Sequence, residues 1–425
     1  MPYNPVRMAK KHINNGVTVS DSEQNDFSLN QGQEPKELEQ YERYLQKYLR
    51  HPAYRNFIGS LKSYSTKNNY SFNLAKYLNT EVNRNLSLDD IISKNPKVIE
   101  SEIIQEIIKQ QEGDKLGYSS SHIFLSSLTH FFAINDIVIN RRKIKKFLGE
   151  NTLKFEYRSY TMEEISRILE ICDKRDRVVV LILASTGMRV GGLAEIKLQN
   201  LKKWIIDTKG THVYQITVYA NSQKSKYQTF CTPETAKAID EYLELRKRCG
   251  ENLKQDPNTG NWIPRETHLI IKQFDKTGYI HSTEPITPLN INIKIMLPKL
   301  HQLGIRKKTL MTESSIPLQR GKTARIRHEL HPCHSLRIFA ITQMQRANLD
   351  KTIREMLVGH DTGLDKVYYK PQDEEILQEY LKAVDLLTIS NENRLQKQVD
   401  YYKERESDLS RMSLELAEIR EKLGI

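Results

Sequence analysis

The chain has 425 residues, and its lysines and arginines exceed its acidic residues to give a formal net charge of +12. The length predicts about two or three domains. The longest strongly apolar run, Val178 to Ala184, is far shorter than the roughly 20 residues that cross a bilayer, so we expect no membrane partner. The four cysteines are far apart and the first residues lack an apolar signal core, which favours a reducing cytoplasm. The positive charge favours a nucleic-acid partner, although a ribosome-associated or merely basic protein would share it.

The N-terminal part divides into an arm and a helical domain. Residues 1–34 are polar and without periodicity, which predicts a disordered arm. From there to residue 147 apolar residues recur at three- and four-residue steps, as in Leu38, Tyr41 and Leu45, and Ser65 with Thr66 is expected to cap a second helix. We therefore predict a compact all-helical domain over 35–147.

A basic run closes this domain. It comprises Arg141, Arg142, Lys143, Lys145 and Lys146. One interpretation is a solvated helix end, where cations complement the helix dipole. The other is a linker that contacts DNA phosphates between two domains, and its position favours DNA binding by these five residues.

Residues 154–390 predict a second domain of mixed structure. Thr161 and Glu164 form a capping box, and residues 177–185 are apolar all round, as in a buried helix that ends at Gly187. Residues 212–219 and 227–231 alternate and predict a β-hairpin. Further helices are expected at 233–248, 333–346, 350–358 and 374–386, with residues 250–282 and 302–330 mostly in loops. The fold class is therefore mainly α with a small β-sheet, an α+β second domain following a helical one.

The last segment, residues 391–425, has a heptad pattern. Leu395, Tyr402, Leu409, Leu416 and Leu423 are spaced by seven, but companion positions such as Gln398 and Arg405 are polar. This pattern predicts a terminal amphipathic helix with coiled-coil character.

A set of charged and nucleophilic residues in the second domain could carry chemistry. Arg189 follows the buried helix, and Lys224 and Lys226 lie at the expected hairpin tip. His334 and Arg337 are three apart and share one helix face, followed by apolar residues. A charged arginine at a buried helix start needs an anion or a partner. The remaining two are His360, in a turn after a helix, and Tyr369, nine residues later.

In this order Arg189, Lys224, His334, Arg337, His360 and Tyr369 resemble the active-site set of the tyrosine recombinases, the phage-integrase family. The resemblance covers residues 35 to 390, because the family also has a helical core-binding domain before the catalytic one. The segment from Leu357 to Pro371 looks most like archaeal and archaeal-virus members. One departure is Gly192, where many members carry an acidic residue; it weakens a supporting contact and leaves the catalytic set intact.

The physical chemistry agrees with this resemblance. Phosphodiester cleavage passes through a charged pentavalent state, which the planar guanidinium groups of Arg189 and Arg337 can stabilise. Tyr369 would be the nucleophile, His334 a general base or phosphate donor, and His360 a second donor. Lys224 would be the general acid for the departing 5′ oxygen, with Lys226 as the alternative. The phosphotyrosine conserves the bond energy, so ligation needs neither ATP nor metal, and no cofactor is expected.

A zinc site is the competing interpretation of the histidines. His328, His331, Cys333 and His334 lie within seven residues, but their spacing matches no common zinc motif. No phosphate-binding glycine loop or two-metal acidic cluster is evident.

The resemblance implies a site-specific recombinase that clamps double-stranded DNA between two domains and acts as a homo-tetramer at synapsis, through a Holliday junction. Integration or excision of a mobile element or virus is the first interpretation. The alternatives are a Xer-type chromosome-dimer resolvase, a type IB topoisomerase and a non-catalytic DNA-binding protein. The expected location is the cytoplasm of a prokaryotic host, associated with the nucleoid.

Overall fold

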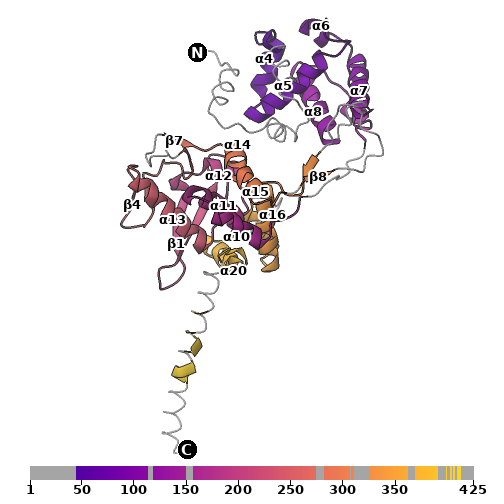
Figure 1. Cartoon of the computed structure of the whole chain (residues 1–425). Coiled ribbons are helices and arrows are strands. Elements are labelled where there is room, and N and C mark those ends of the chain that lie inside the picture. The colour runs from indigo at the N-terminus through magenta and orange to yellow at the C-terminus, as the bar shows by residue number, and fades with distance from the viewer. Residues whose placement is uncertain are drawn as a thin grey trace, which may run out of the picture. The chain divides into compact units, whose positions relative to one another are not determined.

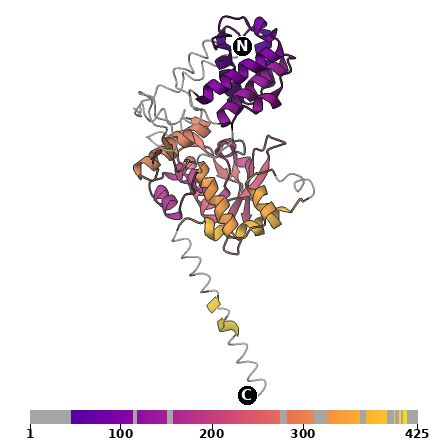
Figure 2. The ribbon, with the colours of Figure 1, turned by 90° about the vertical axis from the view of Figure 1, so that its right-hand side faces the viewer.

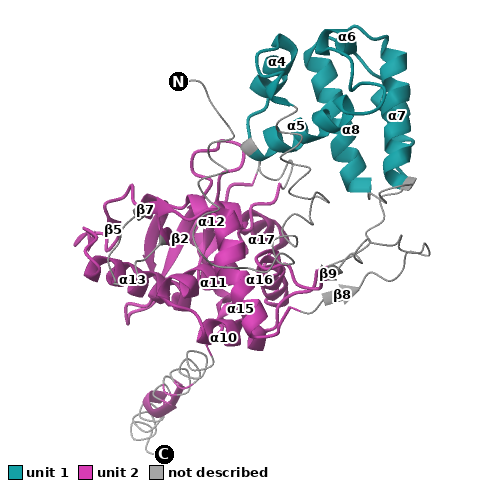
Figure 3. Cartoon of the chain, turned by 45° about the horizontal axis from the view of Figure 1, so that its top comes forward, with its two compact units in different colours: residues 1–154 teal, residues 155–425 magenta. Residues whose placement is uncertain are grey.

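The structure is a computed structural model with two compact units, residues 1–154 and 155–425 (Figure 3). It describes residues 45–112, 118–149, 157–273, 282–306, 308–310, 326–361 and 369–390, with single residues or short stretches between 399 and 412. The predicted arm and most of the predicted terminal helix lie outside these residues. Of the heptad positions, Leu409 is described; it is helical and exposed, as is Met412. No helix among the described residues is long and apolar enough to span a membrane.

The first unit is all-helical in its described part, as the apolar periodicity predicts. Its core contains the fully buried rings of Phe57, Phe131 and Phe132, with Phe57 and Phe131 packed edge-on at 5.4 Å. The cap of the second predicted helix is Ser63 instead of Ser65, because the Ser63 hydroxyl accepts a hydrogen bond from the Thr66 amide. The helices are α4 (Pro52–Ser60), α5 (Tyr64–Leu78), α6 (Leu88–Ile92), α7 (Pro96–Glu112), α8 (Tyr118–Ile134) and α9 (Arg141–Lys145).

In the second unit, helices pack against a small antiparallel sheet (Figures 1 and 2). The sheet has the order β1-β2-β3, with Leu201 opposite Ile216 and Val218 opposite Tyr227. The β2–β3 hairpin is the predicted one, whereas β1 was not predicted. The strands are β1 (Leu201–Ile205), β2 (His212–Val218), β3 (Tyr227–Phe230), β4 (Lys254–Gln255), β5 (Trp262–Ile263), β6 (Ile271–Gln273), β7 (Ser282–Pro285), β8 (Lys308–Leu310) and β9 (Ile326–His328).

The predicted helices of the second unit are observed in the predicted order, whereas α12 (Val190–Glu195) and the helical segment from α14 to α15 (residues 288–302) were not predicted. The helix expected at 374–386 is divided in two, with a turn at Lys382 and Ala383. The helices are α10 (Met162–Glu170), α11 (Lys174–Thr186), α12 (Val190–Glu195), η1 (Leu198–Asn200, a 3₁₀ turn), α13 (Pro233–Arg248), α14 (Pro288–Asn290), η2 (Ile291–Met296, a π-helix), α15 (Leu297–Gln302), α16 (His334–Arg346), α17 (Lys351–Leu357), α19 (Asp373–Leu381) and α20 (Val384–Leu387).

Helix α11 is the central element of this unit. Asp173 caps its start, and every residue from Val178 to Thr186 is buried. Helices α13 and α16 pack against it, and the hydroxyl of Tyr380 on α19 donates to the Ser185 carbonyl at 3.0 Å. The helix ends at Gly187, whose φ of +64° is the left-handed conformation that glycine adopts at little cost. The chain then turns back toward α16 and α17, which sets the position of the candidate site.

Candidate active site

Arg337 joins the ends of α11 and α17. It lies on α16, is 4% exposed, and its Nη1 donates to the carbonyls of Gly187 and of Val358, the latter at 2.9 Å. A Cβ added to Gly187 would lie 3.2 Å from the Cβ of Ala340 on α16, so the glycine permits this close approach. The buried guanidinium is thus fixed by two helix ends.

Arg189 reaches the same turn from the start of α12. Its Nη1 donates to the Gly359 carbonyl at 3.3 Å, while the residue itself is exposed. Gly359 has a φ of +66°, and an added Cβ would overlap the ring of Tyr227. The two arginines therefore bind consecutive carbonyls of the turn after α17, and β3 packs directly beneath that turn.

Two buried polar groups near the turn, one from Arg337 and one from Tyr227, could still bind a ligand. The Nη2 of Arg337 and the hydroxyl of Tyr227 are both buried, and within the described part of the chain neither makes a hydrogen bond of good geometry, although the Arg337 side chain acts on the Tyr227 hydroxyl and opposes the rise of its pKa. Burial and the nearby charge of Arg189 lower the pKa of Arg337, whereas Tyr227, Tyr219 and Glu355 oppose this effect. Burial raises the pKa of Tyr227 to about 12 despite the two arginines. A buried guanidinium with an unpaired N–H group favours an anionic ligand.

The end of β2 explains the glycine at position 192, because Val218 and Tyr219 both lie against it. Tyr219 follows β2 with a positive φ of +51°, and its ring lies against Gly192. A Cβ at Gly192 would overlap the Cγ1 of Val218, so this position has no room for the acidic side chain that many tyrosine recombinases carry there. Burial raises the pKa of Tyr219, and Arg189 and Arg337 oppose the shift. Tyr219 and Tyr227 belong to no motif in the sequence, because their proximity to the arginines depends on the packing of the hairpin.

His334 is the first residue of α16 and lies on the side of the arginines. Its pKa is lowered by burial and by the charges of Arg337 and Arg189, which favours a neutral ring. Its backbone N–H donates to Nδ1 of His331 at 3.1 Å, so the His331 ring satisfies the first amide of the helix. Burial lowers the pKa of His331 to about 4, and a neutral ring can accept this hydrogen bond.

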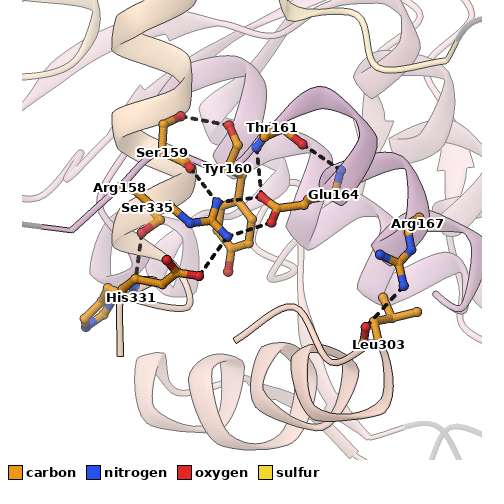
Figure 4. A network of polar contacts seen from close by, with 10 residues as sticks. Arg158, Ser159, Tyr160, Thr161, Glu164, Arg167, Leu303, His331 and Ser335 are labelled. Carbon is orange, nitrogen blue, oxygen red and sulfur yellow. Dashed lines mark hydrogen bonds and ion pairs between the residues drawn. The ribbon is translucent and has the colours of Figure 1, made fainter. Parts of the chain in front are cut away.

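A polar network holds the loop before α16 (Figure 4). Arg158 donates to both carboxylate oxygens of Glu164, at 2.8 and 2.7 Å, and to Glu329 at 3.2 Å. The His331 N–H donates to the Ser335 hydroxyl at 3.0 Å, and the Tyr160 hydroxyl to the Pro332 carbonyl at 3.0 Å. The start of α10 thus fixes the loop that carries His331 and His334.

His360 lies beside the turn that the arginines bind. Its backbone N–H donates to the Glu355 carbonyl at 2.9 Å, and its ring Nδ1 contacts Oε2 of the Glu355 side chain. The structure therefore brings together Arg189, His334, Arg337 and His360. Glu355, which the sequence analysis did not identify, belongs to the same group.

The two remaining candidates of the catalytic set, Lys224 and Tyr369, make no described contact with these four residues. Lys224 and Lys226 are exposed in the connection between β2 and β3. The hydroxyl of Tyr369 donates to Oε1 of Glu375 at 2.7 Å. This hydrogen bond, with the charges of Glu375, Asp350 and Glu379, raises the pKa of Tyr369 to about 12. Tyr368 lies outside the described residues.

The basic run forms helix α9 within the first unit instead of an open linker. Asn140 caps it, and Ile144 is buried. Arg141 donates to the Ser126 hydroxyl at 2.9 Å, and Lys143 binds the buried Glu100 carboxylate at 3.0 Å. The exposed cations without such a contact in the described structure are Arg142, Lys145 and Lys146.

The histidine and cysteine cluster does not have the geometry of a metal site. The rings of His331 and His334 are 5.9 Å apart, and Cys333 is buried. Within the described residues no group of three or more histidine, cysteine or acidic side chains is placed to hold a metal ion.

Comparison with known proteins supports a class of DNA-processing enzymes, the tyrosine recombinases. No family model matches the chain. One relative in this class is tyrosine recombinase XerA of Pyrococcus horikoshii. It is 24% identical to this chain over 167 residues, which are 38% of this chain and 55% of the relative. The match thus spans about half of that relative's length.

Solved structures of the same class are also similar. They include XerA recombinase (TM-score 0.32, 18% identity, 78% of this chain and 97% of that one). The Tn1549 transposon integrase with transposon right end DNA has a TM-score of 0.43, with 15% identity over 81% of this chain and 98% of that one. A lambda integrase dimer bound to a core site has a TM-score of 0.41, with 15% identity over 88% and 84% of the chains.

Proposed function

We propose that the chain is a site-specific tyrosine recombinase that cleaves and rejoins duplex DNA through a covalent 3′-phosphotyrosine intermediate. The observation that carries this proposal is the convergence of Arg189 and Arg337 on one turn, with His334 and His360 beside them. Two guanidinium groups can bind the non-bridging oxygens of a phosphodiester and stabilise the charge that develops in the transition state.

The chemistry needs a nucleophile, a base and an acid. In the proposed step the Tyr369 oxygen attacks phosphorus, the P–O5′ bond breaks, and the 3′ phosphate becomes attached to the tyrosine. His334, which its surroundings keep neutral, accepts the phenolic proton or donates to the phosphate. Lys224 gives a proton to the leaving 5′ oxygen, with Lys226 as the alternative. Ligation is the reverse reaction and consumes no external energy source.

The proposed reaction requires two movements. Tyr369 has to leave Glu375, because its hydroxyl hydrogen bonds to that carboxylate in the structure. The Arg337 Nη2 atom is shielded from solvent together with the Tyr227 hydroxyl. We therefore expect the β2–β3 connection to shift when DNA binds, which would also bring Lys224 toward the phosphate.

Integration or excision of a mobile element or virus is the proposed biological role. Chromosome-dimer resolution is the second candidate, and the sequence similarity to XerA favours it. The DNA that flanks the gene discriminates the two roles: a direct repeat overlapping a tRNA gene supports integration. Double-stranded DNA is the proposed partner in both cases, with assembly into a homo-tetramer at synapsis and a place in the prokaryotic nucleoid.

A nicked suicide substrate tests the chemistry. The wild-type chain should form a covalent protein–DNA adduct, and Tyr369→Phe should bind the same DNA without forming it. Tyr368→Phe is the matched control and should retain adduct formation. An adduct formed by Tyr369→Phe and lost in Tyr368→Phe would assign the nucleophile to Tyr368.

Two further assays separate the other enzyme and binding classes. Relaxation of supercoiled plasmid by the monomer, without exchange between two sites, would identify a type IB topoisomerase. If the wild-type chain binds DNA but forms no adduct, the chain is a non-catalytic DNA-binding protein.

A further inference from the structure

The carboxylate of Glu355 connects two basic residues of the candidate site. It lies on α17, and its side chain is 25% exposed. Oε2 contacts Nδ1 of His360, while Oε1 is 3.6 Å from a guanidinium nitrogen of Arg354. Each oxygen therefore has its own cationic or N–H partner, so the carboxylate has little freedom to rotate.

The contact with His360 defines which ring nitrogen is available to a ligand. A glutamate carboxylate is ordinarily ionised at neutral pH and can only accept hydrogen bonds. Nδ1 must therefore carry the proton that is shared with Oε2. The backbone of His360 is also held in place, because its backbone N–H donates to the Glu355 carbonyl at 2.9 Å. Nε2 is thus the nitrogen left for an external group.

Glu355 is also the carboxylate that acts on the buried arginine. Arg337 is destabilised as a cation by burial and by Arg189, and Glu355 opposes these effects together with Tyr219 and Tyr227. The acidic residue that many tyrosine recombinases carry at position 192 is excluded here, because a side chain there would overlap Val218. Glu355 on α17 is a carboxylate that favours the charged form of Arg337.

We propose that Glu355 is a positioning residue, which orients His360 so that Nε2 faces the scissile phosphate. The phosphate part of this inference rests on the proposed function, whereas the orientation of His360 does not. The residue acts through His360 and does not itself touch the substrate.

Nitrogen-15 NMR of the histidine rings in the DNA-free, full-length chain tests the orientation directly. The His360 signals are assigned from their loss in His360→Asn. We expect protonated Nδ1 in the wild type and in Glu355→Gln, whose amide oxygen can accept the same hydrogen bond. Glu355→Ala should shift the proton toward Nε2, the favoured tautomer of a free ring. Unchanged His360 signals in Glu355→Ala would overturn the proposal.

Adduct formation on the suicide substrate tests the consequence for the reaction. At metal sites, loss of the group that orients a ligating histidine typically costs roughly 10–100-fold, and we take the same range for His360. We expect Glu355→Ala to slow adduct formation by about this factor with DNA affinity unchanged, and Glu355→Gln to recover part of the rate. Exposed Glu170 provides the control Glu170→Ala, which should match the wild type.

A double mutant separates positioning from a general structural effect. If Glu355 acts through His360, adding Glu355→Ala to His360→Asn should cause much less additional loss than it causes alone. Fully additive losses would contradict the positioning role. If the wild type forms no adduct while the NMR result holds, the proposed function fails and the orientation of His360 by Glu355 stands.

Discussion

The hydroxyl of Tyr369 donates a hydrogen bond to Oε1 of Glu375 across 2.7 Å, among carboxylates and not among the arginines. This contact raises the pKa of the phenol to about 12, since a neighbouring negative charge disfavours the phenolate. In this conformation the candidate nucleophile is therefore held in its protonated form.

We predict that Glu375→Gln increases the initial rate of adduct formation several-fold. Removal of the charge should lower the pKa of Tyr369 toward its ordinary value near 10. The alkaline limb of the pH–rate profile should then move to lower pH. The neighbouring exposed residue Glu374 supplies the control Glu374→Gln, which should leave the rate unchanged. A slower reaction of Glu375→Gln would show that this carboxylate assists the reaction.

The second prediction concerns the leaving group. General-acid catalysis contributes roughly 10²–10⁴-fold, so Lys224→Ala should lose about that factor in cleavage rate. A substrate with sulfur in place of the bridging 5′ oxygen needs no proton donor and should restore much of this loss. It should not restore Arg189→Ala or Arg337→Ala, whose defect is in charge stabilisation. Rescue confined to Lys226→Ala would assign the acid to Lys226.

The third prediction separates the cations of α9. Arg142, Lys145 and Lys146 are exposed, whereas Lys143 binds Glu100. Substituting the three exposed residues by alanine should weaken binding about equally for all DNA sequences, because bonds to phosphate carry no base information. The slope of log K against log salt should flatten by about 0.9 for each phosphate that the variant no longer neutralises. Lys143→Ala should instead destabilise the first unit and leave the salt slope unchanged. If Lys143→Ala flattened the slope while the triple variant did not, Lys143 would be the residue that contacts phosphate.

The fourth prediction concerns pH and His331. Its pKa is about 4 in the folded chain, below its ordinary 6.5, so the unfolded chain binds more protons between these values. The stabilisation is fully present above pH 6.5 and is lost as the pH falls toward 4. At pH 5 the loss should be about 2 kcal/mol. Urea unfolding of His331→Gln should lack this part of the pH dependence, and an identical profile in both proteins would contradict it.

Local signals in the sequence were sufficient for many elements. The capping box of Thr161 and Glu164, the end of α11 at Gly187 and the β2–β3 hairpin are observed as predicted, because each depends on residues close in the chain. Strand β1 was not predicted, since its pairing with β2 depends on tertiary packing. The same limit applies to α19 and α20, where the apolar periodicity continues through the turn that separates them.

The candidate site shows the same division between local and long-range information. The order of motifs in the chain indicated Arg189, His334, Arg337 and His360, and the fold brings these side chains close together. Glu355, Tyr219 and Tyr227 belong to no recognised motif, and only packing places them beside the arginines. The acidic surroundings of Tyr369 could not be predicted either. Besides Glu375, the carboxylates of Asp350 and Glu379 raise its pKa, and Asp350 is brought near it by the fold.

The close approach of Gly192 and Val218 has an evolutionary consequence. Any side chain introduced at position 192 would overlap Val218, so an acidic residue there becomes acceptable only after position 218 has changed to a smaller one. Val218 is fully buried in β2, and shortening it first would leave a cavity and destabilise the protein. Each single step is therefore unfavourable, although the two together could be neutral. Lineages that carry this pair are expected to retain the glycine.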